Sequence, residues 1–196
     1  RPYASYYLFH PGPRWRHVDV EQVTGAAVSV LSRGADVVYL YNYHQHALDW
    51  PIPEYQRLLK TLLSLDDLLR LPRRHAVTCR EVVVPGEQYR PPLPATGEVL
   101  SFDLPLGPKP PAGWQPEATV EIAGPTVDAP AVSVNGAACA LRNSDALDNG
   151  NRVLTYSVPL SALPGHNDDT IAVMAAKPKP IKVLSVEARI APSQGQ

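Results

Sequence analysis

The sequence predicts two kinds of structure in succession, an α/β segment and then an all-β domain, within 196 residues. In the first segment, residues 20–33 and 54–70 place apolar side chains at helical spacing. Between them, residues 37–41 form a continuous apolar run, which is typical of a strand buried on both faces of a parallel sheet. Beyond residue 75, short alternating stretches separated by Pro and Gly are typical of an antiparallel sandwich.

The first elements are a strand and a well-bounded helix. Residues 1–9 are rich in aromatic, β-prone side chains and predict a strand. Asp19 and Gln22 have the spacing of a capping box, which places the start of a helix at residue 20. Gly34 has the position of a C-cap glycine, so the helix is expected to end near residue 33.

The apolar run Val-Val-Tyr-Leu-Tyr at residues 37–41 predicts the second strand. Pro53 suits the first turn of the following helix, which is expected to end by residue 71. A strand–helix–strand–helix unit forms a right-handed crossover on a parallel sheet. Two strands cannot complete such a sheet, so we expect further strands upstream of Arg1 and an exposed apolar side on both helices.

The second half predicts about eight short strands. They are expected at residues 76–84, 97–104, 117–123, 131–134, 138–142, 152–158, 170–176 and 181–191. Asn135-Gly136 lies between two apolar stretches and is the strongest hairpin signal in the chain. Seven or eight short strands with turns between them predict a β-sandwich. The expected division is an α/β domain at 1–72, a connector with one strand at 73–96 and the sandwich at 97–196.

Composition excludes some functions. The 22 prolines argue against an all-helical bundle, and the formal charge of −1 without a basic cluster gives no sign of nucleic-acid binding. No apolar run reaches about 18 residues, so no membrane-spanning helix is predicted. Cys79 and Cys139 could pair or remain two buried thiols. The compartment stays open, with an extracytoplasmic or secreted location favoured.

Two stretches resemble parts of carbohydrate-active enzymes. Residues 19–43, with Gly34-Ala35-Asp36 and then Tyr41-Asn42-Tyr43, resemble the last helix and strand of many (β/α)8 glycoside-hydrolase-like proteins. Residues 132–136, together with 160–167 and 171–173, resemble the accessory β-sandwich of glycosidases, of the galactose-binding-like jelly-roll type. The resemblance implies the last strand–helix repeats of an incomplete (β/α)8 barrel followed by a jelly-roll-like β-sandwich.

The resemblance also implies a function. Glycoside hydrolases cleave O-glycosyl bonds with two carboxylates, which in a barrel lie at strand ends mostly absent from this chain. We therefore expect an inactive fragment that binds carbohydrate, needs no cofactor and belongs with a missing N-terminal part. The alternative is a non-catalytic carbohydrate-binding or structural module attached to an inactive barrel. A self-contained α/β plus β protein with no role in sugar binding is a third possibility.

The candidate binding residues follow the two predicted strands, because the carboxyl ends of barrel strands bind ligands. They are Asn42, Tyr43, His44, His46 and Trp50, with Trp15 in the loop after the first strand. Trp50 and Trp15 could stack on sugar rings, while Asn42 and His44 could hydrogen-bond hydroxyl groups. The competing interpretation is an ordinary loop in which the tryptophan covers the core. No catalytic residue can be assigned.

Other polar clusters are assigned structural or solvent-facing roles. His44, His46 and Asp49 fall short of a zinc site, which needs three well-placed ligands. Residues 145–149 and 168–169 match no calcium loop, so no metal is predicted. Asp66-Asp67 and residues 73–75 (Arg-Arg-His) are interpreted as solvated charge, and Trp114 as a cover for a sandwich edge.

Overall fold

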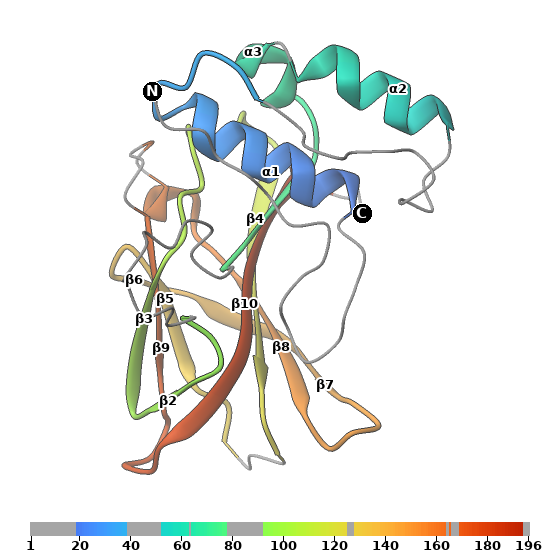
Figure 1. Ribbon diagram of the computed structural model, residues 1–196. Coiled ribbons are helices and arrows are strands. Elements are labelled where there is room, and N and C mark those ends of the chain that lie inside the picture. The colour runs from blue at the N-terminus through green and yellow to red at the C-terminus, as the bar shows by residue number, and fades with distance from the viewer. Residues whose placement is uncertain are drawn as a thin grey trace, which may run out of the picture.

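The architecture is a two-sheet β structure with helices at one end (Figure 1). The computed structural model of the protein describes residues 19–38, 52–62, 64–77, 92–124, 128–163, 165 and 169–193. Every strand pairing among these residues is antiparallel, and the strands belong to a six-stranded and a four-stranded sheet.

The larger sheet is built around its longest strand. Its members are β1 (Arg73–Ala76), β2 (Ala95–Gly97), β4 (Trp114–Ile122), β7 (Ala140–Ala146), β8 (Arg152–Ser157) and β10 (Ile181–Pro192). The order is β1-β10-β4-β8-β7, and β2 pairs with the first part of β10. Strand β10 therefore contacts β4 on one side and both β1 and β2 on the other.

The smaller sheet has the order β3-β9-β5-β6. Its strands are β3 (Val99–Asp103), β9 (Thr170–Met174), β5 (Ala131–Val134) and β6 (Ala137–Ala138). Asn135 and Gly136 join β5 to β6 with φ angles of 49° and 81°. Positive φ at both central positions is the backbone of a type I′ hairpin turn, which confirms the predicted hairpin.

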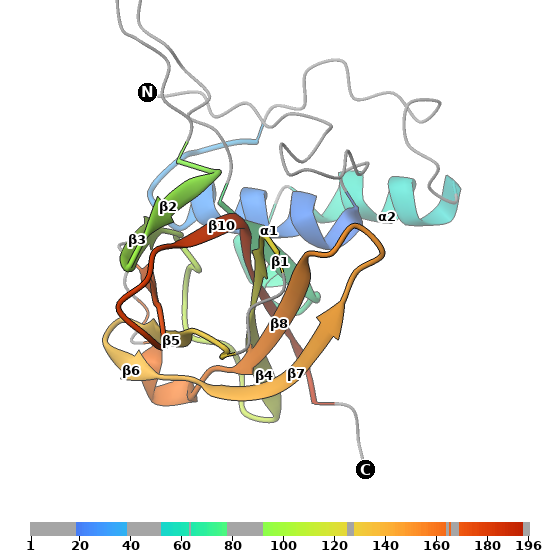
Figure 2. The same ribbon diagram turned by 90° about the horizontal axis from the view of Figure 1, so that it is seen from below.

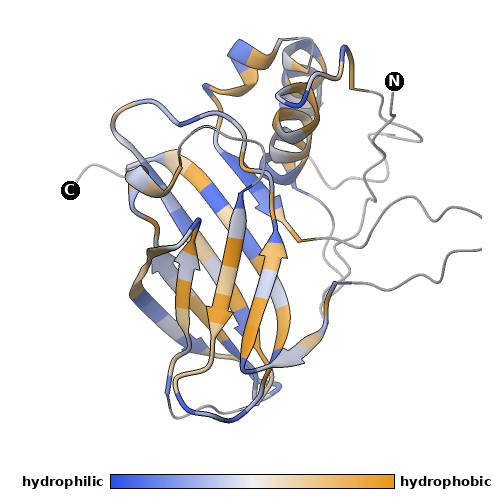
Figure 3. Cartoon of the chain, turned by 90° about the vertical axis from the view of Figure 1, so that its left-hand side faces the viewer, coloured by the Kyte–Doolittle hydropathy of each residue, from blue (hydrophilic) through white to orange (hydrophobic). Residues whose placement is uncertain are grey.

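The two sheets enclose one apolar core (Figure 2). Alternate residues of each strand point into it, as the striped hydropathy of the strands in Figure 3 shows. Val120 and Ile190 come from the larger sheet and Val132 and Ile171 from the smaller one, and each is at most 2% exposed. Tyr156 is buried with them, and its hydroxyl donates to the carbonyl of Pro130 at 2.6 Å.

Three helices lie at one end of the sheets: α1 (Val20–Leu31), α2 (Ile52–Thr61) and α3 (Leu65–Leu68). Helix α1 begins with the predicted capping box, in which Gln22 N donates to Asp19 Oδ1 at 2.8 Å and Asp19 N donates to Gln22 Oε1 at 3.0 Å. Gly34 ends it with a φ of 92°. None of the helices in the described ranges is long and apolar enough to cross a membrane.

Helix α1 packs closely against the edge of β1 that does not pair with β10. A Cβ atom placed on Gly25 would lie 2.1 Å from the carbonyl oxygen of Arg74, so only glycine allows this approach. The side chains about one helical turn before and after Gly25 then reach opposite faces of the sheet. Glu21 contacts Arg74 and Arg189 on the outer face, whereas Ser29 contacts His75 on the inner face.

The predicted strands of the sandwich agree with the structure, most closely at β5, β8 and β10. The first expected strand, 76–84, differs: β1 occupies residues 73–76, and residues 78–84 lie outside the described part. The connector strand is also a member of the larger sheet, because β1 pairs with β10. The charged side chains of residues 73–75 gave no indication that this segment belongs to the sheet. The free thiol of Cys139 is half-buried, and Cys79 lies outside the described residues.

Of the predicted α/β segment, only the helices are found among the described residues. Residues 37 and 38 are not in a strand and Val37 is 67% exposed, while residues 39–41 and 1–9 lie outside the described part. The described sheets contain no parallel pair and no (β/α)8 barrel. The second expected helix is divided in two, because Ser64 caps the short helix α3. The molecule is accordingly a β-rich protein with few helices.

The prediction of an exposed apolar side on the first helix is wrong. Val23, Ala27 and Val28 of α1 are buried, and with Leu58, Leu62 and Leu68 they form a second, smaller core. Helices α2 and α3 cover this side. The prediction assumed a partner outside the chain, whereas α2 and α3 of the same chain provide the cover. On α2, Leu59 remains 40% exposed.

Candidate functional site

The residues singled out by sequence all lie outside the described part of the chain. They are Asn42, Tyr43, His44, His46, Trp50 and Trp15. Their assignment as a sugar subsite stays a prediction. The described residues offer a different candidate, a groove on the outer face of the six-stranded sheet.

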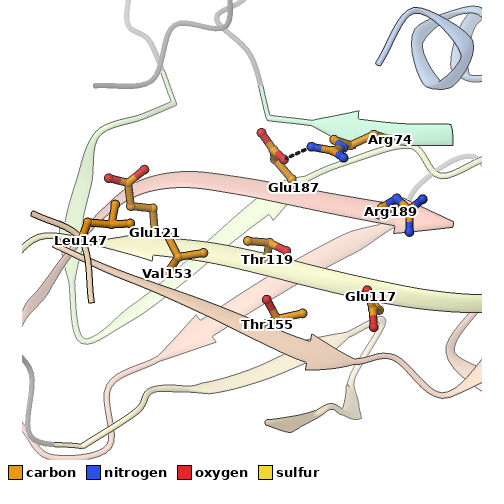
Figure 4. Close-up of a pocket in the computed structure, with 9 residues that line it drawn as sticks. All are labelled: Arg74, Glu117, Thr119, Glu121, Leu147, Val153, Thr155, Glu187 and Arg189. Carbon is orange, nitrogen blue, oxygen red and sulfur yellow. Dashed lines mark ion pairs between the residues drawn. The ribbon is translucent and has the colours of Figure 1, made fainter. Parts of the chain in front are cut away.

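The outer groove, as we call it, is a hollow of about 280 Å³ across strands β1, β10, β4 and β8 (Figure 4). Its described lining consists of Arg74, Glu117, Thr119, Glu121, Leu147, Val153, Thr155, Glu187 and Arg189. Thr119 and Thr155 lie in the middle, with Glu121, Leu147 and Val153 towards one end and Glu117 and Arg189 towards the other. The volume is near the lower end of the range for small-molecule sites, about 300 to 1,000 Å³.

Strand alternation places these side chains on one face. On β4, Glu117, Thr119 and Glu121 point outward while Ala118 and Val120 enter the core. Register then brings partner residues alongside, because Thr119 lies opposite Thr155 of β8 and opposite Glu187 of β10. The polar rows of three strands thus become one continuous surface.

One end of the groove is fixed by charge pairs with α1. Glu21 accepts two hydrogen bonds from Arg189, both 2.8 Å long, and a third from Arg74 at 3.2 Å. These hydrogen bonds, Arg189 first, lower the pKa of Glu21 and raise that of Arg189. Arg74 also lies 3.7 Å from a carboxylate oxygen of Glu187. Both guanidinium groups are therefore held in defined positions.

The opposite end is fixed by an amide. Asn151 Nδ2 donates to Glu121 Oε1 at 3.0 Å, and the Asn151 carbonyl accepts from Leu147 N at 2.8 Å. Glu121 is almost fully buried despite its place on the outer face. A buried carboxylate held by a neighbouring donor presents its remaining lone pairs in a fixed direction.

The chemistry of the outer groove is that of a hydrogen-bonding surface. It offers three carboxylates, two guanidinium groups and two hydroxyls, so acceptors and donors are interspersed. The described lining contains no aromatic side chain, so a ligand would be held by hydrogen bonds rather than by ring stacking. A polyhydroxylated molecule such as a sugar matches this alternation of donors and acceptors.

A second polar cluster lies behind the outer groove, on the inner side of β1. Arg73 and His75 are 0% and 2% exposed. Ser29 Oγ donates to the carbonyl of Pro105 at 2.7 Å and lies 3.0 Å from His75 Nδ1. Because the Ser29 hydroxyl donates its hydrogen to Pro105, Ser29 Oγ can only accept from His75. The hydrogen-bond network therefore assigns the ring proton to His75 Nδ1, which donates to Ser29.

Burial dominates the electrostatics of this cluster. Desolvation, assisted by the charge of Arg73, lowers the pKa of His75 to about 3, so the ring is neutral at physiological pH. Burial also lowers the pKa of Arg73 to about 10. Arg73 Nη2 donates to the carbonyl of Pro108 at 3.0 Å, while its Nε and Nη1 have no hydrogen-bond partner among the described residues. The cluster joins α1 and the loop 104–108 to the sheet.

Residues 73–75 were interpreted as solvated linker charge, and for Arg73 and His75 this is wrong. Arg is mostly exposed in proteins and His is intermediate, but Arg73 and His75 lie on the inward-facing side of β1, beneath α1. Asp66 and Asp67 are exposed, as predicted. Trp114 begins β4 and is partly buried against the core, in agreement with its expected covering role.

The buried Asp169 has a structural role. It accepts from Leu106 N at 2.9 Å and from Asn135 Nδ2 at 2.8 Å, and Asn135 Oδ1 accepts from Thr170 N at 2.8 Å. This network ties the β5–β6 turn to β9 and to the loop after β3. Within the described part of the chain, no three His, Cys, Asp or Glu residues are grouped as metal ligands.

No protein-family model and no curated protein matches the sequence.

Sequence reasoning did not find the outer groove. Its traces are the alternation of Glu117, Thr119 and Glu121 on β4 and that of Glu187 and Arg189 on β10, which predict outward-facing polar rows but not that the rows are neighbours. The partners come from β8 and β10, 30 to 70 positions later, and depend on register. Candidate residues on separate strands of an antiparallel sheet cannot be grouped before that register is known.

Proposed function

We propose that this chain is part of a carbohydrate-active protein and that its β-sandwich is a non-catalytic module binding glycans in the outer groove. The observation that supports this most directly is the fixed arrangement of acceptors and donors in the groove. Glu21 holds Arg189 and Arg74, and Asn151 holds Glu121, so little side-chain entropy remains to be lost on binding.

The finer assignment of the fold belongs to the same proposal. We infer that residues 1–72 are the last strand–helix repeats of a (β/α)8 barrel of the glycoside-hydrolase type and that the sandwich is jelly-roll-like. The motif resemblance supports this, as does the order of helices followed by two antiparallel sheets. The chain alone would not hydrolyse glycosidic bonds, and Asn42, His44 and Trp50 would form part of a sugar subsite in the complete barrel.

Binding of neutral oligosaccharides by the whole chain tests this function. Isothermal titration against trimers of glucose, galactose, mannose and xylose should identify at least one ligand. The double variant Thr119→Val/Thr155→Val keeps side-chain shape and removes two hydroxyls from the middle of the groove, so its affinity should fall about tenfold. Thr96→Val, on exposed β2 outside the groove, should bind as the unaltered chain does.

Two outcomes would reject the glycan-binding function. One is that no trimer binds at millimolar concentration, and the other is that the Thr119/Thr155 variant and the Thr96 variant bind equally. A structural role is the second candidate, and the close fit of α1 at Gly25 favours it. In that case the sandwich would only support the helical part, and its loss would lower the melting temperature of the complete protein without changing glycan affinity.

A further inference from the structure

The turn between β9 and β10 is at the end of the sandwich away from the helices (Figure 1). A second concavity lies beside this turn. Its volume is about 410 Å³, which is within the range of small-molecule sites. The end of β4 and the residues between Ala175 and Lys182 supply most of its described lining. We call it the lysine pocket.

The lysine pocket carries excess positive charge. Lys177, Lys179 and Lys182 line it, and Asp128 is the one carboxylate among its described lining residues. Three ammonium groups against one carboxylate leave a local charge of +2, whereas the whole chain is at −1. Asp128 Oδ2 lies 2.6 Å from Lys177 Nζ, so its charge is already matched. The excess therefore resides on Lys179 and Lys182.

The turn that presents these lysines is stiff. Pro178 and Pro180 stand on either side of Lys179, and a proline ring fixes φ near −65°. The end of β4 is tied to β10, because Ala123 N donates to the carbonyl of Lys182 at 2.9 Å. A restricted backbone loses little entropy when a ligand binds, which favours a binding site over a merely solvated turn.

The floor of the lysine pocket is apolar. Ile181 contributes aliphatic surface, and Ala123 and Ala175 add small side chains that leave space. An apolar floor under a cationic rim suits a ligand that has both a hydrocarbon face and an anionic group. A pyranose ring with a carboxylate or sulfate substituent has this character.

We propose that the lysine pocket binds an acidic sugar, a hexuronate or a sulfate ester within a glycan. The anionic group would lie against the ammonium groups of Lys179 and Lys182 and the ring against the apolar floor. The sugar part of this inference rests on the proposed function, while the anionic part rests on the lysines. Proteins that bind duplex DNA can contact about 6 to 10 phosphates, and anionic membranes are recognised by clusters of about 4 to 8 basic residues, more than this pocket supplies.

The test compares charged and uncharged forms of one ligand with the whole chain. Isothermal titration would use the galacturonate trimer against its methyl ester, and a chondroitin sulfate tetramer against its desulfated form. At least one acidic probe should bind ten times more tightly than its less charged counterpart. That advantage should shrink several-fold between 20 and 300 mM NaCl, because salt screens exposed charges. Equal affinity within both pairs would overturn the inference.

Matched variants assign the effect to the lysine pocket. Lys179→Ala/Lys182→Ala should lose at least tenfold in affinity for the acidic probe. Lys60→Ala/Lys109→Ala removes the same charge from exposed positions outside the lysine pocket and should stay within twofold. Equal losses in both variants would mean a general charge effect and overturn the inference. So would inorganic phosphate or phosphatidylserine vesicles that bind as tightly as the acidic sugar.

The two proposals fail separately. If neutral trimers bind and depend on Thr119 and Thr155 while acidic probes gain nothing, only the lysine pocket is rejected. If no neutral trimer binds but the acidic probe binds and depends on Lys179 and Lys182, the outer groove is rejected and the lysine pocket stands. Circular dichroism of each variant confirms that the sheets are intact.

Discussion

The two edges of the six-stranded sheet are protected in different ways. At one edge, β1 is covered by α1, which approaches so closely that Gly25 touches the backbone of Arg74. At the other edge, β7 is largely exposed and carries Arg142, Asn143 and Asp145, with a register shift near residue 142. A covered edge permits buried polar groups, whereas an open edge needs charge and irregularity to prevent pairing with another chain.

The comparison also separates two uses of polar residues. Beneath the covered edge, Arg73 and His75 lie in a water-poor environment, where each polar group matters for stability. On β7, polar side chains remain hydrated and their individual contributions are small. Stability should therefore respond strongly to changes at the α1–β1 contact and weakly to changes on β7.

The largest effect is expected from Gly25→Ala. The new Cβ atom would lie 2.1 Å from a backbone oxygen, so α1 must move away from β1 and both cores loosen. The free energy of unfolding, measured by urea denaturation, should fall by about 3 kcal/mol, at the upper end of overpacking effects. In Gly97→Ala the closest contact of the new Cβ would be the flexible end of the Leu100 side chain, so that control should change little. Equal losses would contradict the close fit.

An intermediate effect is expected from acid. The unfolded chain binds a proton at His75 below about pH 6.5, but the folded protein does so only near pH 3. Unfolding therefore takes up a proton between these values, and stability falls as the pH is lowered from 6.5 towards 3. The slope contributed by this group approaches about 1.4 kcal/mol per pH unit.

His75→Gln isolates that effect, because it removes the titrating group and retains hydrogen-bonding capacity. Urea denaturation of both proteins between pH 7 and pH 5 should show a shallower pH dependence in the variant. This window lies above the range in which Glu21, whose pKa is lowered from 4.5, would add to acid destabilisation in the same direction. Identical slopes in the two proteins would show that His75 is accessible to protons in the folded state.

The smallest effect is expected from a pair of carboxylates, one at each edge. Glu21→Gln weakens the paired hydrogen bonds to Arg189, and the melting temperature should drop by an amount equivalent to about 1 kcal/mol. Asp145→Asn on β7 changes one exposed hydrogen bond to Asn143 and should cost at most about 0.5 kcal/mol. A larger loss at Asp145 than at Glu21 would reverse the ranking of the edges.

Much of the sandwich could be predicted because its signals are local. Alternation located β4, β8 and β10, Asn135-Gly136 fixed a hairpin, and Asp19 with Gln22 fixed the start of α1. Each signal depends on neighbours in the sequence. The assignment of β5 at 131–134 agrees at both ends for the same reason.

The edge strand β1 could not be predicted, because its burial depends on a helix about 50 positions earlier. Arg-Arg-His has the composition of a solvated linker, and only contact with α1 reveals a strand with two inward polar side chains. The outer groove could not be predicted for a related reason, because its residues are brought together by the register between strands that are distant in the sequence. The six subsite residues, from Trp15 to Trp50, remain predictions.

The position of β10 in the chain has a consequence for biosynthesis. This strand joins β1, β2 and β4, yet it is the last of the described strands to emerge from the ribosome. Glu21 and Arg189, which bond α1 to it, are 168 positions apart. Helix α1 can therefore complete its contacts with the larger sheet only after residues 181–192 have been synthesised, whereas its apolar side can pack on α2 and α3 earlier. A premature stop before residue 181 would release a chain without its central strand.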